Sequence, residues 1–211
     1  MMMLQSRKGT TQARGRLRRR KLLDAARRLL GQSTLDVIGL ADVAEAAGVP
    51  KTSAYHFFPS IYDLYVELSL ELAADLRGEL EKPLRHEHSE WQGVISELVD
   101  RGAAFFIENS AARQLQIGPK TPPDIKSRDR VNDFALARLF VGHIASLFRL
   151  PDTMDWDPIF FRAIEVADLM FVLSVRESGT VTPFFSIEAS RAMVAYLELY
   201  IPKVLSPAVR S

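Results

Sequence analysis

The chain has 211 residues, 47% of them hydrophobic, which is enough for one large domain or two smaller ones with a substantial core. It contains no cysteine, which excludes disulfides, thiolate metal sites and a cysteine nucleophile. No apolar run approaches the ~20 residues that a membrane span needs, and the basic N-terminus lacks the apolar core of a signal peptide, so we expect a cytoplasmic protein without a membrane partner.

Charge is unevenly distributed along the chain, although the net charge is only +1. Residues 1–60 hold 11 Lys and Arg against 4 Asp and Glu, a net charge of +7, whereas residues 61–211 hold 16 against 22, a net charge of −6. This asymmetry favours a polyanion as the partner of the N-terminal part alone. A basic tail that only keeps the chain soluble is the alternative explanation.

The N-terminal segment is basic before any apolar pattern begins. Residues 1–15 carry no apolar periodicity, so we expect a flexible basic arm there. The run 16–21 is almost continuously basic and leads into a helix whose apolar stripe begins at Leu22. Arg18 and Arg19 are expected to contact the phosphates of a bound nucleic acid, adding affinity that falls with salt. A solvated, charged helix end is the alternative.

The stretch 40–60 predicts two short helices joined by a tight turn. Apolar residues recur at i, i+3, i+4 and i+7 from Leu40, which indicates a helix that buries one stripe. Gly48 can take the left-handed backbone conformation that ends a helix. Pro50 fits the first position of the second helix, where its missing N–H costs nothing.

The second of these helices has an unusual outward face. Its inward side carries Ala54, Phe57 and Phe58, which leaves four polar side chains pointing away from the core: Lys51, Thr52, Tyr55 and His56. A cation, a hydroxyl, a phenol and an imidazole on one face can donate to phosphate oxygens and base edges in a major groove. Residues 16–60 are therefore predicted to form a three-helix, helix-turn-helix domain that binds double-stranded DNA.

The letters G-V-P-K-T-S-A-Y-H-F-F-P-S, residues 48–60, resemble the recognition-helix signature of the Tet repressor (TetR) family of bacterial transcription regulators. The resemblance covers roughly residues 18–68; beyond them the chain is similar to the family only in helical character and length. It implies a homodimeric repressor that binds a palindromic operator and is released by a small-molecule effector. By this match, the family's base contacts fall on Lys51, Thr52 and Ser53, and its phosphate contacts on Tyr55 and His56.

Two positions depart from the family pattern. Ile38 and Gly39 stand where relatives often carry two hydroxyl residues before the first helix of the motif. Ile61 stands where relatives often carry Lys. Each difference removes an expected contact with the DNA backbone, so affinity is expected to depend more on the N-terminal arm.

The remaining residues, 61–211, predict further helices and no convincing strand pair. A long helix over 61–80 is a candidate transmitter between the DNA-binding head and the body. Other helices are expected over 89–109, 111–117 and 131–150, then after an Asp157 cap to Ser178, and after a Ser186 cap to Pro202. The last two are apolar on several faces, which favours a homodimer interface built as a four-helix bundle. We therefore expect an all-α fold whose second domain binds a ligand and dimerises.

Polar groups among the aromatic residues of the body are candidates for a ligand cavity. Sites between bundle helices are mainly apolar with a few polar groups. The candidate residues are Arg101, Phe105, Phe140, His143 and Asp168. Ordinary core packing is the commoner role for such aromatic residues, and a core or surface position is commoner for such a histidine.

No pattern in the sequence favours a catalytic site or a metal site. His86, His88 and Glu90 form a local cluster of metal-capable side chains, but their spacing beside a proline loop argues against a metal site. Neither a nucleophile elbow nor a glycine-rich phosphate loop is present, so we expect no cofactor and no enzyme activity. An all-helical enzyme, detectable by turnover, and an adaptor that uses the motif for protein contacts are the alternatives.

Overall fold

The computed structural model describes residues 3–152 and 154–208, with the side chains of 3–12, 124 and 126–133 excepted. This part of the chain forms nine α-helices and no strand, and an isolated antiparallel bridge joins Phe148 to Pro207. The expectation of an all-α fold is confirmed. Among the helices so described, none has both the length and the apolar character needed to cross a bilayer.

The chain divides into two compact units, Met1–Glu71 and Leu72–Ser211. The boundary falls inside helix α4 (Ile61–Glu81), later than the boundary after Ser60 expected from the sequence. Helix α4 therefore supplies residues to both units.

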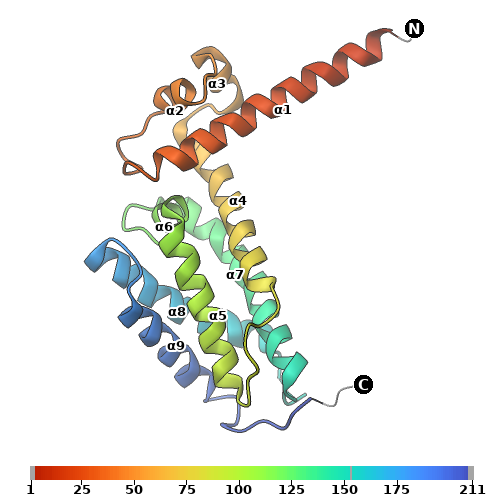
Figure 1. Cartoon of the computed structure of the whole chain (residues 1–211), viewed down its shortest axis with the longest axis vertical. Coiled ribbons are helices and arrows are strands. Elements are labelled where there is room, and N and C mark those ends of the chain that lie inside the picture. Colours follow the sequence, from red (N-terminus) through yellow and green to blue (C-terminus); the bar gives the residue numbers. More distant parts are fainter. Residues whose placement is uncertain (1–2, 153, 209–211) are drawn as a thin grey trace. The chain divides into compact units, whose positions relative to one another are not determined.

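The first unit contains α1 (Met3–Leu29), α2 (Leu40–Ala46), α3 (Lys51–Phe57) and the start of α4 (Figure 1). Its core combines fully buried residues from each helix: Leu22, Val43, Ala54, Leu64 and Leu68. Helix α1 begins at Met3, although the sequence predicts a flexible arm up to residue 15, whose first two residues lie outside the described chain. Extending an existing helix is easier than starting one, so packing around Leu22 supports helical residues before it.

The second unit contains five further helices: α5 (Trp91–Glu108), α6 (Ser110–Gln116), α7 (Pro123–Leu147), α8 (Trp156–Ser178) and α9 (Pro183–Leu197). Helices α8 and α9 lie side by side, α7 packs on α8, and α5 packs on α9 (Figure 1). Fully buried side chains such as Trp91, Leu98 and Phe160 fill the space between them.

Helix α7 begins at Pro123, eight residues before the start at residue 131 expected from the sequence. Two predicted helix caps in the second unit also differ from the structure. Helix α8 is capped by Asp155 rather than Asp157, because the Asp155 carboxylate accepts the Asp157 N–H at 3.3 Å. Helix α9 starts at Pro183, after a Thr182 cap, so the predicted Ser186 cap is wrong. Ser186 lies one turn inside the helix, where its hydroxyl donates to Asp100 Oδ1 at 2.8 Å.

Candidate DNA-reading surface and ligand cavity

A tight turn sets α3 against α2. Gly48 has a φ of +62°, in the left-handed region expected from the sequence, and the Val49 N–H then returns to the Ala44 carbonyl at 2.9 Å. Pro50 is the N-cap residue of α3 rather than its first helical residue. Ala54 is fully buried, so one side of the short helix is fixed to the core.

The opposite side of α3 is open to solvent. Lys51, Thr52, Tyr55 and His56 are all exposed, as the helical spacing predicts, whereas Ser53 is half-buried. Tyr55 has 52% of its surface exposed, although tyrosine side chains are often largely buried. Donors of four chemical kinds therefore share one accessible face of a rigidly anchored helix.

At the N-termini of α2 and α4, the carboxylate of an aspartate in the first turn accepts a hydrogen bond from the backbone N–H of the residue before the helix. Gly39, the N-cap residue of α2, has no side chain, and its own N–H donates to Asp42 Oδ2 at 2.8 Å. At α4, the Ser60 N–H donates to Asp63 Oδ2 at 3.0 Å, and the Asp63 N–H returns to Ser60 Oγ at 3.2 Å. Ser60 and Asp63 therefore form a capping box at the start of α4.

The two basic residues chosen from α1 have different surroundings. Arg18 is exposed. Arg19 pairs with Glu67, its Nε donating to Oε1 at 2.7 Å, and its guanidinium lies 4.9 Å from the centre of the Phe58 ring. The hydrogen bond to Glu67 raises the pKa of Arg19. Arg19 therefore ties α1 to the end of α3 and to α4, a role that sequence reasoning missed.

One signal for that contact was present in the sequence. Glu67 and Glu71 lie four residues apart on α4 and so share a face. Arg20 Nη1 donates to Glu71 Oε1 at 3.1 Å, which makes a second link of the same kind. An acidic pair on one helix and a basic run on another predict ion pairs between the two helices. They do not indicate which arginines remain available to bind DNA.

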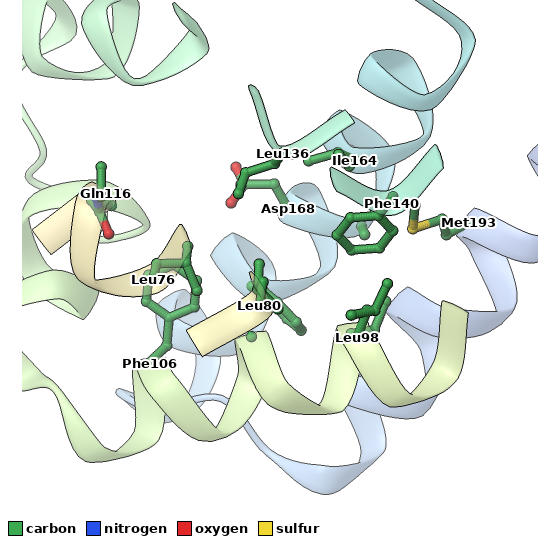
Figure 2. Close-up of a pocket in the computed structure, with 15 residues that line it drawn as sticks. Leu76, Leu80, Leu98, Phe106, Gln116, Leu136, Phe140, Ile164, Asp168 and Met193 are labelled. Carbon is green, nitrogen blue, oxygen red and sulfur yellow. The ribbon is translucent and has the colours of Figure 1, made fainter. Parts of the chain in front are cut away.

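The second unit contains an apolar cavity of about 80 Å³. Among the described residues, fifteen line it: Ala73, Leu76, Leu80, Leu98, Val99, Gly102, Phe106, Gln116, Leu136, Phe140, Ile164, Ala167, Asp168, Phe171 and Met193. They come from α4 through α9, and Figure 2 shows their side chains converging from several helices. Buried apolar walls with few polar groups are typical of small-molecule sites.

The structure brings only two of the predicted ligand residues to this cavity, Phe140 and Asp168. Phe105 is buried, but its neighbour Phe106 lines the cavity instead, because consecutive residues of a helix point in different directions. His143 lies elsewhere, with Nε2 2.8 Å from the Leu80 carbonyl oxygen. Gln116, a buried amide that lines the cavity, was not among the residues predicted from the sequence.

Arg101 is also absent from the cavity lining, because it belongs to a buried ionic cluster. It pairs with Glu97 one turn earlier and donates to the Lys82 and Pro83 carbonyls at 2.7 and 2.6 Å. Glu97 also accepts the Arg85 N–H at 2.7 Å. Together these bonds fasten the segment 82–90 to α5.

The same cluster accounts for one of the histidines considered for metal binding. His88 Nε2 lies 2.8 Å from Glu97 Oε2. Burial opposes ionisation of Glu97, but the Arg85 N–H, His88 and Arg101 outweigh it and lower the pKa of Glu97 to about 2. The carboxylate is therefore a fixed negative charge that organises its neighbours.

Apolar side chains remain exposed on the last two helices. Leu169 on α8 and Phe184 and Ile187 on α9 have 52%, 64% and 51% of their surface exposed. Such exposure on two adjoining helices leaves apolar surface that a second protein could cover.

Comparisons with known proteins agree across both units. Residues 22–68 match the family model described as bacterial regulatory proteins, tetR family, and residues 89–201 match the model described as tetracyclin repressor-like, C-terminal domain. No curated protein matches the sequence.

Solved structures show the same fold at low identity. A TetR-family transcriptional regulator from Streptomyces coelicolor is 22% identical, with a TM-score of 0.66 over 87% of this chain and 99% of the other. A TetR transcriptional regulator from Rhodococcus sp. RHA1 is 16% identical, with a TM-score of 0.63 over 86% and 96% of the two chains.

The helix-turn-helix unit, the helical second unit and the two family models that match them lead to one conclusion. The chain belongs to the TetR family, and it is a DNA-binding transcription regulator and not an enzyme.

Proposed function

We propose that the protein is a cytoplasmic repressor that binds a palindromic operator as a homodimer and leaves it when a small molecule occupies the body. The observation that carries the proposal is the exposed polar face of α3, with Lys51, Thr52, Tyr55 and His56 held outward by a buried anchor. We assign base contacts to Lys51, Thr52 and Ser53, and phosphate contacts to Tyr55, His56 and Arg18.

Arg19 contributes to DNA binding mainly by positioning α3. Its guanidinium is engaged by Glu67 and Phe58. A cation held in this way adds to the positive potential of the surface but is less available for a direct phosphate bond. Arg18 and Arg19 are both exposed, but Arg19 is held by Glu67, so Arg18 is the better candidate for that bond.

The homodimer is proposed to form through α8 and α9. Leu169, Phe184 and Ile187 would be buried against the same residues of a second copy, giving a four-helix bundle with twofold symmetry. A twofold dimer presents two copies of α3, which suits two operator half-sites about one DNA turn or a multiple of it apart.

Release from DNA is proposed to depend on enlargement of the cavity by the effector. Its volume of about 80 Å³ is well below the roughly 300–1,000 Å³ of typical ligand sites. An effector must therefore favour a conformation with a larger cavity, which is a shift between states of the protein. Leu76 and Leu80 of α4 line the cavity, so α4 is the proposed transmitter.

The test of the DNA-reading surface is selection of bound fragments from random DNA, followed by titrations of selected and scrambled duplexes at several salt concentrations. Replacing Lys51 or Thr52 by Ala should reduce the preference for the selected sequence by about 1–3 kcal/mol per base contact. Replacing Tyr55 and His56 together should weaken both duplexes alike. Lys203→Ala, which removes an exposed lysine from the second unit, is the control.

Two results would contradict this assignment. Equal loss on every duplex for all the α3 variants would remove base reading from Lys51 and Thr52. Failure of the unmodified protein to bind any duplex at low salt would remove the DNA-binding proposal for α3 altogether.

The dimer is tested separately by sedimentation. Leu169→Glu and Ile187→Glu should each produce a folded monomer, since a charge in a buried apolar interface is costly. Ile107→Glu, at a position on α5 with 48% of its surface exposed, is the control and should stay dimeric. Unchanged dimers in both α8 and α9 variants would reject this interface.

A further inference from the structure

The basic residues of α1 divide between two sides of the helix. Arg20 and Arg27 lie on the side that faces α4, where Arg20 Nη1 donates to Glu71 Oε1 at 3.1 Å and Arg27 Nη2 lies 3.9 Å from Glu71 Oε2. Arg20 also pairs with Asp24 at 3.1 Å. Carboxylates therefore offset the positive charge on this side of α1.

Another side of α1 carries Arg14, Arg18 and Lys21, which we call the α1 cation row. These positions lie at i, i+4 and i+7, so they fall within about 60° of one another around the helix axis. All three side chains are exposed, and no hydrogen bond or ion pair joins them to any residue that the structure describes. Their charges therefore remain available to a polyanion.

Two contacts relate the cation row to the helix-turn-helix. Arg28, two turns after Lys21 on the same side of α1, donates through Nη2 to the Ala46 carbonyl of α2 at 3.4 Å. Gly15, at the start of the row, lies against the end of α3, since a Cβ atom there would be 3.9 Å from the Phe57 ring. Figure 1 shows α1 continuing past α2 and α3 toward its N-terminal end. The row therefore extends the surface formed by α2 and α3.

We propose that the α1 cation row binds the phosphate backbone of DNA next to the base pairs that α3 reads. This inference rests on the proposed function, because it extends the contact between the first unit and the operator. The row spans about 10 Å at 1.5 Å per residue. Successive phosphates of one strand are about 3.4 Å apart along the duplex axis, so three long side chains spread over this length can each reach one.

The helical state of this segment determines which cations can bind. A flexible arm could turn any of its cations toward a phosphate, whereas a helix holds the row in one direction. Arg16 is exposed as well, but it lies about half a turn of the helix away from the row. DNA on that side would meet the carboxylates of Asp24 and Glu71, which repel phosphates. We therefore expect direct phosphate bonds from the row and none from Arg16.

The test measures how salt weakens binding of the full-length protein to a selected operator duplex, by fluorescence anisotropy from 50 to 200 mM salt. The triple variant combines Arg14→Gln, Arg18→Gln and Lys21→Gln. Each phosphate contact adds about 0.9 to the slope of log Kd against log salt, so the unmodified protein should lose about 40-fold more affinity over this range than the triple variant. Preference for the operator over a scrambled duplex should not change, because phosphate contacts carry no sequence information.

Two matched variants separate a directed contact from the total charge of α1. Arg16→Gln removes one exposed cation from the opposite side of the same helix and should leave the slope unchanged. Ala13→Arg and Leu17→Arg, added to the triple variant, return two cations at exposed positions turned about 100° around the helix, and they should not restore the slope. Circular dichroism shows whether each variant keeps its helices.

Uncharged methylphosphonates, placed at single positions of the duplex, locate the contacts. Each replacement removes one phosphate charge. The positions that weaken binding of the unmodified protein but not of the triple variant should be neighbouring phosphates of one strand, beside the base pairs that Lys51 and Thr52 read.

The outcomes separate this inference from the proposed function. A triple variant that binds its operator with the slope of the unmodified protein overturns the phosphate contacts of the row and leaves base reading by α3 intact. An Arg16→Gln slope as low as that of a single change within the row, or full recovery with the two displaced cations, also overturns the inference, because only total charge would then matter. An unmodified protein that binds no duplex at low salt would instead reject the proposed function.

Discussion

The buried cluster around Glu97 allows a stability prediction to be worked from the structure. The carboxylate of Glu97 and the guanidinium of Arg101 leave only 7% and 4% of their side-chain surface exposed. In Glu97→Ala, Arg101 loses its counter-ion while it remains buried, and the Arg85 N–H and His88 lose an acceptor. Breaking a buried pair in this way typically costs about 3–5 kcal/mol.

The loss should be visible in thermal unfolding. A change of 1 kcal/mol shifts Tm by roughly 3 °C in a domain of this size, so Glu97→Ala should unfold about 9–15 °C below the unmodified protein. The matched control is Glu81→Ala, whose carboxylate pairs with Arg77 at 3.4 Å with both side chains about half exposed. Exposed pairs contribute about 0–1 kcal/mol, so this control should move Tm by 3 °C or less.

A double variant tests whether the loss of stability comes from leaving Arg101 as an unpaired buried charge. Glu97→Leu combined with Arg101→Met removes both charges and keeps most of the apolar volume, so it should be more stable than Glu97→Ala. The reasoning would be refuted if Glu97→Ala melted within 3 °C of the unmodified protein, or if the double variant lost as much as the two single changes added together. Either result would mean that the cluster does not fasten segment 82–90.

Three further predictions concern single positions. At pH 5–7, the unmodified protein should have a larger free energy of unfolding than Glu97→Gln, as measured by urea unfolding. This difference should narrow as the pH falls from about 4.5 toward 2. The pKa of Glu97 is lowered to about 2, so its carboxylate loses its stabilising contribution when it is protonated. Gly48→Ala should cost about 1–2 kcal/mol, because φ is +62° there, whereas Gly142→Ala within α7 should be neutral or stabilising in the same urea titrations. Arg18→Ala should reduce the salt dependence of DNA binding by about one unit of slope, and Arg19→Ala should instead lower the Tm of the first unit; the opposite pattern would reverse their assignments.

The DNA-binding motif could be predicted closely from the sequence because its signals are local. The spacing of apolar residues from Leu40 sets the buried side of α2, and Gly48 supplies the backbone conformation of the turn. Ser60 and Asp63 satisfy each other's backbone within one helical turn. Each of these features depends on residues fewer than eight positions apart, so the sequence displays it directly.

The ligand cavity could be predicted only in part. The sequence pointed to aromatic residues in the body, but the cavity takes Phe106 in place of Phe105 and adds Gln116. Helical spacing alone does not decide this, because α5 buries both phenylalanines. Which side of a buried helix borders a cavity depends on how the neighbouring helices fill the space.

The sequence by itself determined most of the helices, the place of the sharp turn and the polar face of α3, since these depend on backbone preferences and the spacing of neighbours. It did not predict the helical residues 3–15 and 123–130. Only the tertiary structure decided the partners of the charges. Arg19 meets Glu67 from 48 positions away, and Arg101 is bound among carbonyls of segment 82–90 and not in the cavity. Long side chains can reach many partners, and packing brings only some of them within hydrogen-bond distance, so no local pattern could identify the pair that forms.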